Sequence, residues 1–315
     1  MNICILDGYT LNPGDLDWSP ISILGDCSIY DRTEKCDVIS RAQDAEIVLT
    51  NKVILDTETM AQLPKLKYIG VLATGYNVVD IKAAKDRGIV VTDVPAYSTM
   101  SVAQMVFAHI LNIANSVAHY AGGIAKWAEC KDFCYYDTNL TELAGKTMGI
   151  VGLGNTGLAT AKIALAFGIN VIAMTSKKKN QLPQGIEPVS KETLFKEADI
   201  ISLNCPLTES TREIINSDSI ALMKQSAIVV NTGRGPLVND KDVADALNSG
   251  RIAAYAADVL TVEPPQPTNP LLTAKNAFIT PHIAWASKEA RTRLLNIAAD
   301  NVKNFINGNP SNIIL

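Results

Sequence analysis

Short runs of apolar residues alternate with stretches of helical periodicity along almost the whole chain. In the first third, the runs of strand length are Ile3–Leu6, Ile47–Thr50, Lys67–Leu72 and Ile89–Thr92. Helical patterns lie between them at Thr57–Gln62 and Val79–Arg87. Strands that alternate with helices are typical of parallel sheets, so the pattern predicts an α/β fold.

A longer helix is expected after the break at Pro95. Apolar residues recur at helical spacing from Ser101 to Tyr120, and a polar, aromatic stretch from Lys126 to Thr141 follows. A glycine-rich strand then opens a second series of strands. The further members of that series are expected at Val171–Met174, Ile200–Asn204, Ile228–Asn231, Ala253–Ala257 and Phe278–Thr280.

Two later helices carry end signals. Asn239 is a good N-cap for a helix at Asp240–Asn248, and Gly250 is a good stop for it. Ser287 can cap a last amphipathic helix that ends near Gly308. We predict two Rossmann-like domains, one flavodoxin-like and one dinucleotide-binding, each a parallel sheet flanked by helices. The first, for substrate, spans 1–98 and 287–315, and the second, for NAD(P), spans 99–286.

The charge balance excludes several classes of partner. The 315 residues include 28 basic and 32 acidic side chains, which gives a net charge of -4. Such a balance lacks the excess of basic residues that binding to nucleic acid or to an anionic membrane requires. Met1–Asp7 lacks the basic start of a signal peptide. The longest apolar stretch, Met105–Ala118, is interrupted by polar residues and is too short to span a membrane. We expect a cytoplasmic protein.

The six cysteines do not have the pattern of a disulfide framework in a chain of this length. Cys4 and Cys205 lie in strand-like runs and are expected in the core. Cys130 and Cys134 have a spacing that zinc can use, but no second pair of ligands accompanies them. We therefore expect no metal site.

The stretch Gly149–Gly157 reads as a buried strand, then G-x-G-x-x-G, then the start of a helix. In that context Gly152 permits a tight turn, Gly154 lets the backbone approach a pyrophosphate, and Gly157 lets the helix pack closely on its strand. The N-terminus of the helix offers N–H groups and a positive dipole end to the phosphates. The motif predicts a dinucleotide site.

Charged residues follow the last three predicted strands. Arg234 follows Ile228–Asn231, Asp258 follows Ala253–Ala257, His282 follows Phe278–Thr280, and Glu263 stands between the last two strands. Ligands bind at the carboxyl ends of strands in open α/β sheets, so these side chains are expected at one edge of the sheet.

These residue types suit hydride transfer to a 2-oxo acid. The fork of Arg234 can hold a carboxylate by two hydrogen bonds, and His282 can exchange a proton with a substrate oxygen near neutral pH. Glu263 would orient the imidazole and favour its protonated form. The cofactor would supply the hydride.

Each residue alone has a structural alternative. Arg234 in a turn can be a solvated charge, His282 can cap a strand, Glu263 can be a surface residue and Asp258 can cap a turn. The conjunction of these residues downstream of the glycine loop favours the functional interpretation. His109 and His119 lie in the pattern of the long helix, and we interpret both as structural.

Over essentially its whole length the sequence resembles the D-isomer-specific 2-hydroxyacid dehydrogenases. The segments that carry the resemblance are Gly70–Asn77, Tyr97–Ala103, Leu143–Thr147, the glycine loop, Asn231–Gly235, Ala257–Val259, Glu263–Pro264 and Pro281–Trp285. Within the family, His282–Trp285 and Asp132–Tyr135 are most similar to the glycerate dehydrogenase, or hydroxypyruvate reductase, branch. The regulatory tail of many phosphoglycerate dehydrogenases is not expected.

The resemblance implies roles for the matching positions. Arg234 would bind the substrate carboxylate and polarise the carbonyl, His282 would donate the proton in reduction, and Glu263 would be the partner of His282. Substrate contacts would also come from Ala73, Thr74, Gly75 and Trp285. Cofactor contacts would come from Thr99, Gly152, Gly154, Asn155, Thr156, Gly157, Cys205, Pro206, Thr211, Thr232, Gly233, Arg234, Asp258, His282 and Ala284. The family is typically dimeric through the helix after residue 99 and the neighbouring segment.

The sequence departs from the family where the adenine ribose would bind. An acidic residue should end the strand Val171–Met174, but Thr175, Ser176 and Lys177 follow it, with two further lysines. Without a carboxylate nothing repels a 2′-phosphate, and lysines can attract one. The alternative is that the lysines form a solvated turn. NAD or NADP is expected, with NADP slightly favoured.

The sequence thus predicts a D-2-hydroxyacid dehydrogenase that transfers hydride reversibly between NAD(P)H and a small 2-oxo acid, with hydroxypyruvate or glyoxylate as substrate. The alternative is a catalytically weak, dinucleotide-sensing binding protein of the same fold. A formate dehydrogenase is disfavoured, because that branch carries glutamine where this chain has Glu263. Contacts with the substrate's side chain are expected from loops such as Asn51–Val53 and the region near Trp285. The substrate and the direction of the reaction stay open.

Overall fold

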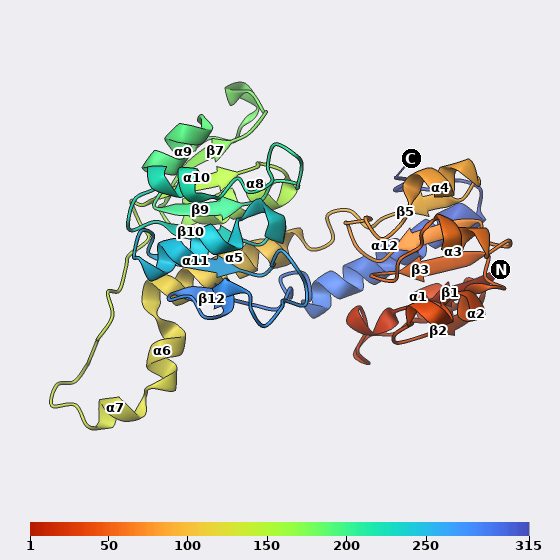
Figure 1. The fold of residues 1–315 in the computed structure, drawn as a ribbon, viewed down its shortest axis with the longest axis horizontal. Coiled ribbons are helices and arrows are strands. Elements are labelled where there is room, and N and C mark those ends of the chain that lie inside the picture. The colour runs from red at the N-terminus through yellow and green to blue at the C-terminus, as the bar shows by residue number, and fades with distance from the viewer. Residues whose placement is uncertain (315) are drawn as a thin grey trace. The chain divides into compact units, whose positions relative to one another are not determined.

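The structure, a computed structural model, describes residues 1–314 and divides the chain into two compact units. Unit 1 is Met1–Ser98 with Ala286–Leu315, and unit 2 is Thr99–Trp285. Figure 1 shows a sheet with helices packed on it in each. The domain limits predicted from the sequence fell after residues 98 and 286. The roles predicted for the two domains stay predictions.

Unit 1 is built on a five-stranded parallel sheet in the order β2-β1-β3-β4-β5. Its strands are β1 (Asn2–Ile5), β2 (Asp26–Ile29), β3 (Ile47–Thr50), β4 (Tyr68–Val71) and β5 (Val90–Thr92). Its helices are α1 (Ser19–Ser22), α2 (Val38–Ala42), α3 (Thr57–Ala61), α4 (Ile81–Asp86) and α12 (Lys288–Ile306), with 3-10 turns η1 (Gly8–Thr10) and η2 (Lys35–Asp37). Four of these strands match the predicted runs, and β2 was not predicted.

The last helix of the chain completes unit 1. Ser287 caps α12 by accepting a hydrogen bond from the N–H of Ala290. The ring of Phe305 packs on Tyr68 of β4 with a centroid distance of 4.7 Å. Asn301, which is buried, donates to the carbonyl of Asp93 at 2.9 Å. The first 98 residues therefore share one core with a helix from the far end of the sequence.

Unit 2 is built on a seven-stranded parallel sheet in the order β12-β11-β10-β9-β6-β7-β8. Its strands are β6 (Thr147–Val151), β7 (Asn170–Met174), β8 (Ile186–Pro188), β9 (Ile200–Leu203), β10 (Ile228–Asn231), β11 (Ala254–Ala257) and β12 (Ala277–Ile279). Its helices are α5 (Thr99–Asn115), α6 (Val117–Gly122), α7 (Ala125–Ala128), α8 (Asn155–Ala166), α9 (Lys191–Glu197), α10 (Ser217–Leu222) and α11 (Asp240–Asn248), with η3 (Lys179–Gln181), η4 (Gly235–Leu237) and η5 (Pro270–Leu272). The two parallel sheets flanked by helices confirm the predicted fold class.

Apolar cores cover both faces of this sheet, because side chains alternate between faces along a strand. Ile150 of β6 joins the core that includes Val106 of α5 and Ala161 of α8. Its neighbour Val151 joins the core that includes Phe195 of α9 and Val243 of α11. Because helices cover both faces of the sheet, as is usual for parallel sheets, polar groups are expected at the carboxyl ends of the strands and not on the faces.

The predicted helix from Ser101 to Tyr120 is divided in the structure. α5 ends at Asn115, because Ser116 has φ 49° in the left-handed region, and α6 begins at Val117. The returning chain supplies the reason, since Thr141 donates its N–H to the carbonyl of Ala114 at 2.9 Å. Residues 117–141, which we call the arm, project from unit 2 (Figure 1).

None of the helices formed by residues 1–314 is long and apolar enough to cross a membrane. Within the same residues, no three His, Cys, Asp or Glu side chains gather in a way that could hold a metal ion. Cys4 and Cys205 are buried, as the sequence predicted, and all six cysteines are free thiols.

Candidate active site

The glycine loop joins β6 to α8 and has the geometry that its three glycines predict. Gly152 has φ 91°, and a Cβ there would lie 2.7 Å from the backbone nitrogen of Cys205. A Cβ on Gly157 would lie 2.1 Å from the carbonyl oxygen of Gly152, whereas one on Gly154 would meet nothing within 4 Å. The turn and the close helix contact therefore require glycine, and the space beside Gly154 is open.

The start of α8 suits an anion. Gly154 occupies the N-cap position and makes no side-chain capping bond, and the first turn holds no acidic residue. Asn155 and Thr156 are the first residues of the helix, so their N–H groups lie at its positive end. A helix N-terminus of this kind binds phosphate well.

His282 and Glu263 form a close pair at the carboxyl edge of the same sheet. Nδ1 of His282, in the loop after β12, lies 2.5 Å from Oε2 of Glu263. The other oxygen of Glu263 accepts the N–H of Leu260 at 3.0 Å, which fixes the carboxylate on the loop after β11. Because a carboxylate accepts hydrogen bonds, Nδ1 carries a proton, and Nε2 is the nitrogen that can exchange a proton with a ligand.

Asp258 holds the loop that carries His282. Its carboxylate is 1% exposed and accepts the N–H of Ile283 at 2.9 Å and the N–H of Ala284 at 2.7 Å. His282 itself has φ 55°, a conformation that a non-glycine residue adopts only where its surroundings enforce it. Within the protein, Asp258 therefore caps the turn after His282, which is the structural role that the sequence offered as an alternative.

The loop with Arg234 is fixed by a buried amide. Asn231, at the end of β10, accepts the N–H of Gly233 at 3.1 Å and donates to the carbonyl of Arg234 at 3.0 Å. The Arg234 side chain is exposed, and its Nη1 donates to the carbonyl of Gly233 at 2.8 Å. Since β10, β11 and β12 are neighbours in the sheet, Arg234, Glu263 and His282 follow three adjacent strands.

Known proteins are similar to this chain over its whole length. The family model "D-isomer specific 2-hydroxyacid dehydrogenase, NAD binding domain" matches residues 105–284. A hydroxypyruvate reductase of Blautia hydrogenotrophica is 47% identical and aligns with 100% of this chain and 99% of its own length. This chain belongs to the D-isomer-specific 2-hydroxyacid dehydrogenases.

Other members of the 2-hydroxyacid dehydrogenase family, and one solved structure of the same fold, support the assignment. A glycerate dehydrogenase of Methylorubrum extorquens is 38% identical over 88% of both chains. The structure of an acyclic imino acid reductase (Bsp5) in complex with NADPH and D-Arg has a TM-score of 0.87 at 29% identity and covers 100% of both chains. The family is NAD(P)-dependent, and its members act on the CH–OH group of 2-hydroxy acids, as the sequence predicted.

Buried polar atoms without partners test whether this dehydrogenase fits a nicotinamide dinucleotide. Oδ1 of Asn204, after β9, and Oγ1 of Thr232, after β10, are buried and have no hydrogen-bond partner among the described residues. Both are at the carboxyl edge, on the strands between β6 and β11. Buried polar groups are rarely left unpaired, so these oxygens fit a ligand that carries hydrogen-bond donors.

Some of the predicted contact residues around this edge are buried, and others hold their own loops by hydrogen bonds to backbone carbonyls. Ala284 is 4% exposed, and Cys205 is 9% exposed and packs beside Gly152. Thr211 holds its own loop instead, because its hydroxyl donates to the carbonyl of Pro206 at 2.7 Å. Trp285 donates from Nε1 to the carbonyl of His282 at 2.9 Å, and Thr99 is the first residue of α5.

The expected ribose end of the site follows β7. The hydroxyl of Thr175 accepts the N–H of Lys177 at 3.2 Å, and Ser176 and Lys177 are exposed. Of the three lysines that the sequence placed there, Lys179 pairs with Glu187 at 2.9 Å. Because the Lys179–Glu187 pair is neutral as a whole, the net positive charge of this segment comes from Lys177 and Lys178.

The predicted substrate residues Ala73, Thr74 and Gly75 belong to unit 1 and follow β4. The carbonyl of Ala73 accepts the N–H of Val94 at 3.0 Å, and the hydroxyl of Thr74 donates to the carbonyl of Val94 at 2.8 Å. The loop is thus fixed to the segment after β5, and its binding role stays a prediction.

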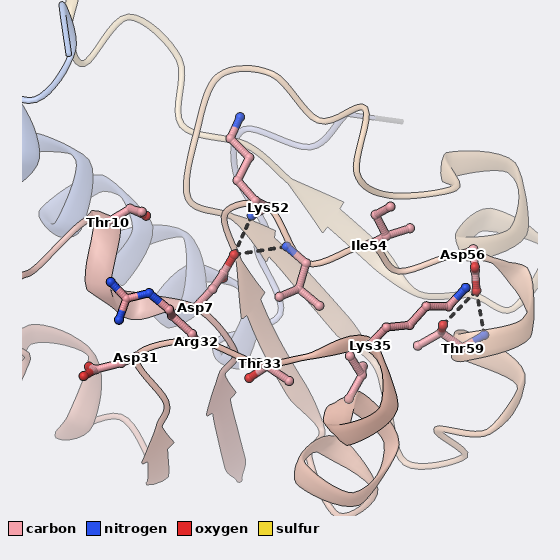
Figure 2. Close-up of a pocket in the computed structure, with 12 residues that line it drawn as sticks. Asp7, Thr10, Asp31, Arg32, Thr33, Lys35, Lys52, Ile54, Asp56 and Thr59 are labelled. Carbon is pink, nitrogen blue, oxygen red and sulfur yellow. Dashed lines mark hydrogen bonds between the residues drawn. The ribbon is translucent and has the colours of Figure 1, made fainter. Parts of the chain in front are cut away.

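Unit 1 also has a pocket of about 410 Å³ at the carboxyl ends of β1, β2 and β3 (Figure 2). Both oxygens of Asp7 face the loop after β3, with N–H···O distances of 2.7 Å from Asn51 and 3.0 Å from Val53. Lys52 and Val53, from the segment expected to contact the substrate's side chain, line the pocket. Arg234, Glu263 and His282 do not line it.

Sequence reasoning missed several polar residues that support the site. Asn231 is fully buried at the end of an apolar strand, which is a signal that a single sequence offers. Ser101 donates to the carbonyl of Ala284 at 2.6 Å, and Thr280 donates to Asp258 at 2.6 Å. Nothing in the sequence indicates these two contacts, because they join segments far apart along the chain.

Proposed function

We propose that this enzyme reduces hydroxypyruvate to D-glycerate, or glyoxylate to glycolate, which has no stereocentre. The observation that carries the proposal is the His282–Glu263 pair, at 2.5 Å, at the carboxyl edge of the sheet that also carries the glycine loop. A reduced nicotinamide supplies the hydride when it is bound. The residues of the chain then have to bind the acid, orient it and supply one proton.

His282 donates that proton from Nε2 to the substrate oxygen, while Glu263 at Nδ1 keeps the ring oriented and stabilises its charge before transfer. Arg234 holds the substrate carboxylate with its planar fork of N–H donors, and the N–H groups of Ala73, Thr74 and Gly75 are proposed as further donors to the same carboxylate. Gly75→Pro removes one of these N–H groups and leaves the hydrogen bond from the hydroxyl of Thr74 to Val94 in place, so it tests one of the three donors.

The cofactor contacts are proposed as the sequence placed them. Asn155 and Thr156 present N–H groups to the pyrophosphate, and Thr232 and Asp258 lie at the nicotinamide end. We propose NADPH as the preferred donor, supported by the absence of a carboxylate at Thr175 and by the exposed Lys177 and Lys178. A preference for NADPH favours the direction of reduction.

We also propose a homodimer formed through the arm. The arm carries large exposed apolar side chains, with exposed fractions of 89% at Phe133, 74% at Tyr136 and 50% at Trp127. Internal hydrogen bonds hold its shape, such as that from Nε1 of Trp127 to the carbonyl of Phe133 at 2.9 Å. Large apolar side chains exposed to water on a segment of defined conformation are typical of a protein–protein interface, and we propose a second copy of this chain as the partner. We propose a cytoplasmic location, which suits six free thiols.

The decisive experiment is a panel of small 2-oxo acids, each assayed with NADPH and with NADH. We expect turnover of hydroxypyruvate and glyoxylate, and a loss of about 10²- to 10⁴-fold in kcat for His282→Ala. Near-normal turnover by His282→Ala at neutral pH would refute the role of His282. Tight cofactor binding without turnover of any acid in the panel would favour a dinucleotide-sensing protein instead.

A further inference from the structure

A buried histidine of α5 lies behind the loop that carries His282. His109 is 6% exposed, and its Nε2 lies 3.2 Å from Oγ1 of Thr280, the last residue before Pro281 and His282. Oγ1 of Thr280 in turn lies 2.6 Å from Oδ1 of Asp258. The three side chains form a chain of hydrogen bonds that leads from a helix to the carboxylate of the loop.

The direction of each hydrogen bond follows from a count of protons. Both oxygens of Asp258 already accept backbone N–H groups, so the carboxylate acts as an acceptor and the hydroxyl of Thr280 gives it its only proton. The oxygen of Thr280 must then accept from the imidazole. His109 is therefore protonated at Nε2, and burial lowers its pKa, which keeps the ring neutral.

α5 contacts the loop at a second point. Ser101, two turns before His109 on the helix, donates its hydroxyl to the carbonyl of Ala284 at 2.6 Å. The helix thus contacts the loop on both sides of His282, at Thr280 and at Ala284. Between these points His282 has a left-handed backbone, which is stable only while the neighbouring contacts impose it.

We propose that His109 is a positioning residue for proton transfer: through Thr280 and Asp258 it anchors the loop to α5 and so fixes His282 beside Glu263. The inference rests on the proposed role of His282 as proton donor. It assigns a function to a residue that the sequence indicated only as structural, and His109 itself touches no reacting atom.

Steady-state kinetics of four variants test the proposal. His109→Phe fills the space without an N–H, Thr280→Val removes the hydroxyl, and His109→Gln keeps a donor. Ile110→Val is the matched control, because Ile110 is a buried neighbour on α5 that belongs to the core. A misplaced catalytic group can cost up to about 10²-fold, and we expect a fall of about tenfold in kcat for His109→Phe and for Thr280→Val.

The accompanying measurements separate positioning from general damage. The dissociation constant of the cofactor should stay within about twofold, because the lost interaction acts only on the chemical step. The double variant His109→Phe/Thr280→Val should lose little more than either single variant, since both break one chain. His109→Gln should recover most of the rate, and Ile110→Val should retain it.

A second measurement needs no substitution at His109. The chain has three histidines, so ¹⁵N-labelled imidazoles are readily assigned with His119→Gln and His282→Gln variants. We expect His109 as the neutral Nε2–H tautomer. An Nδ1–H tautomer would overturn the inference even if His109→Phe failed to fold.

An unchanged kcat for His109→Phe, or strictly additive losses in the double variant, would also overturn it. These outcomes differ from a failure of the proposed function. In that case His282→Ala would retain its turnover, whereas a failure of this inference alone leaves His282→Ala slow and His109→Phe fast.

Discussion

Nδ1 of His282 lies 2.5 Å from Oε2 of Glu263, and the second oxygen of Glu263 is held by the N–H of Leu260. The main chain thus fixes the carboxylate of Glu263 independently of its contact with the imidazole of His282. A carboxylate with one oxygen on the backbone and one on a ring is suited to hold that ring in a single orientation.

Glu263→Gln should lower kcat by about 10- to 10²-fold, because the amide loses the negative charge that stabilises the protonated ring before transfer. The Michaelis constant for the cofactor should change little. Glu209→Gln, an exposed residue of another loop, is the control and should retain the parental rate. A Glu263→Gln enzyme with parental kcat would contradict the assigned partnership.

Asp258→Asn should both slow the enzyme and destabilise unit 2. Asparagine keeps one acceptor oxygen and has an NH2 group in place of the other, so one of the bonds from the N–H groups of Ile283 and Ala284 is lost, and an unmade bond at a buried site costs about 1–3 kcal/mol. The free energy of unfolding in urea measures this. Asp245→Asn is the matched control, since the Lys241–Asp245 pair is exposed to solvent and should contribute little to stability. Equal losses in the two variants would argue against a special role for Asp258.

Thr175→Asp should shift cofactor preference toward NADH. A carboxylate after β7 would repel a 2′-phosphate and accept the ribose hydroxyls, and we expect the NADPH-to-NADH ratio of kcat/KM to fall about tenfold or more. Thr175→Asn provides the neutral control. If the ratio in Thr175→Asp equals that of the parent, the assignment of this position to the ribose site is wrong.

The stability of unit 1 should depend on pH through Asp15. Arg291 donates to both oxygens of Asp15 at 2.7 Å and, by these hydrogen bonds, lowers the pKa of that carboxyl. A pKa that is lower in the folded than in the unfolded state gives stability that is complete above the unfolded pKa of 3.8 and is lost as the pH falls through the folded pKa.

The melting temperature of Asp15→Asn should therefore lie below that of the parent at neutral pH, and the difference should shrink as the pH falls below about 4. Asp17→Asn, with a carboxylate that contacts Ser19 and not Arg291, is the comparison. A difference that stays constant down to pH 3 would show that Arg291 does not act on the charge of Asp15.

Phe133→Ser should weaken self-association without loss of the fold, because Phe133 is 89% exposed in the single chain. Light scattering after size-exclusion chromatography measures the mass in solution. A dimer that is unaffected by Phe133→Ser and Trp127→Ser together would place its interface elsewhere.

The sequence predicted much of the fold because buried parallel strands are nearly continuous apolar runs. The helix Asp240–Asn248 was predicted with its observed limits, since Asn239 caps it by a local bond to Asp242. The edge strands β2 and β8 were missed because they are short and partly exposed, so they lack that pattern.

The candidate site was predictable where chemistry-bearing residues follow strands, and less so where support comes from a distance. Arg234, Glu263 and His282 could be placed at one edge from the strand order alone. The end of α5 at Asn115 depends on Thr141, and the contact of His109 with Thr280 joins residues 171 positions apart. A single sequence carries no signal for contacts of that kind.

The packing of α12 in unit 1 has a consequence for synthesis on the ribosome. Phe305 and Asn301 complete the core around Tyr68 and Asp93, yet all of unit 2 is translated before them. The amino-terminal 98 residues must therefore leave the ribosome with one apolar face uncovered until α12 has been translated. During that interval unit 2 is the part of the nascent chain able to reach its final form, so the order of folding should be the reverse of the order of emergence.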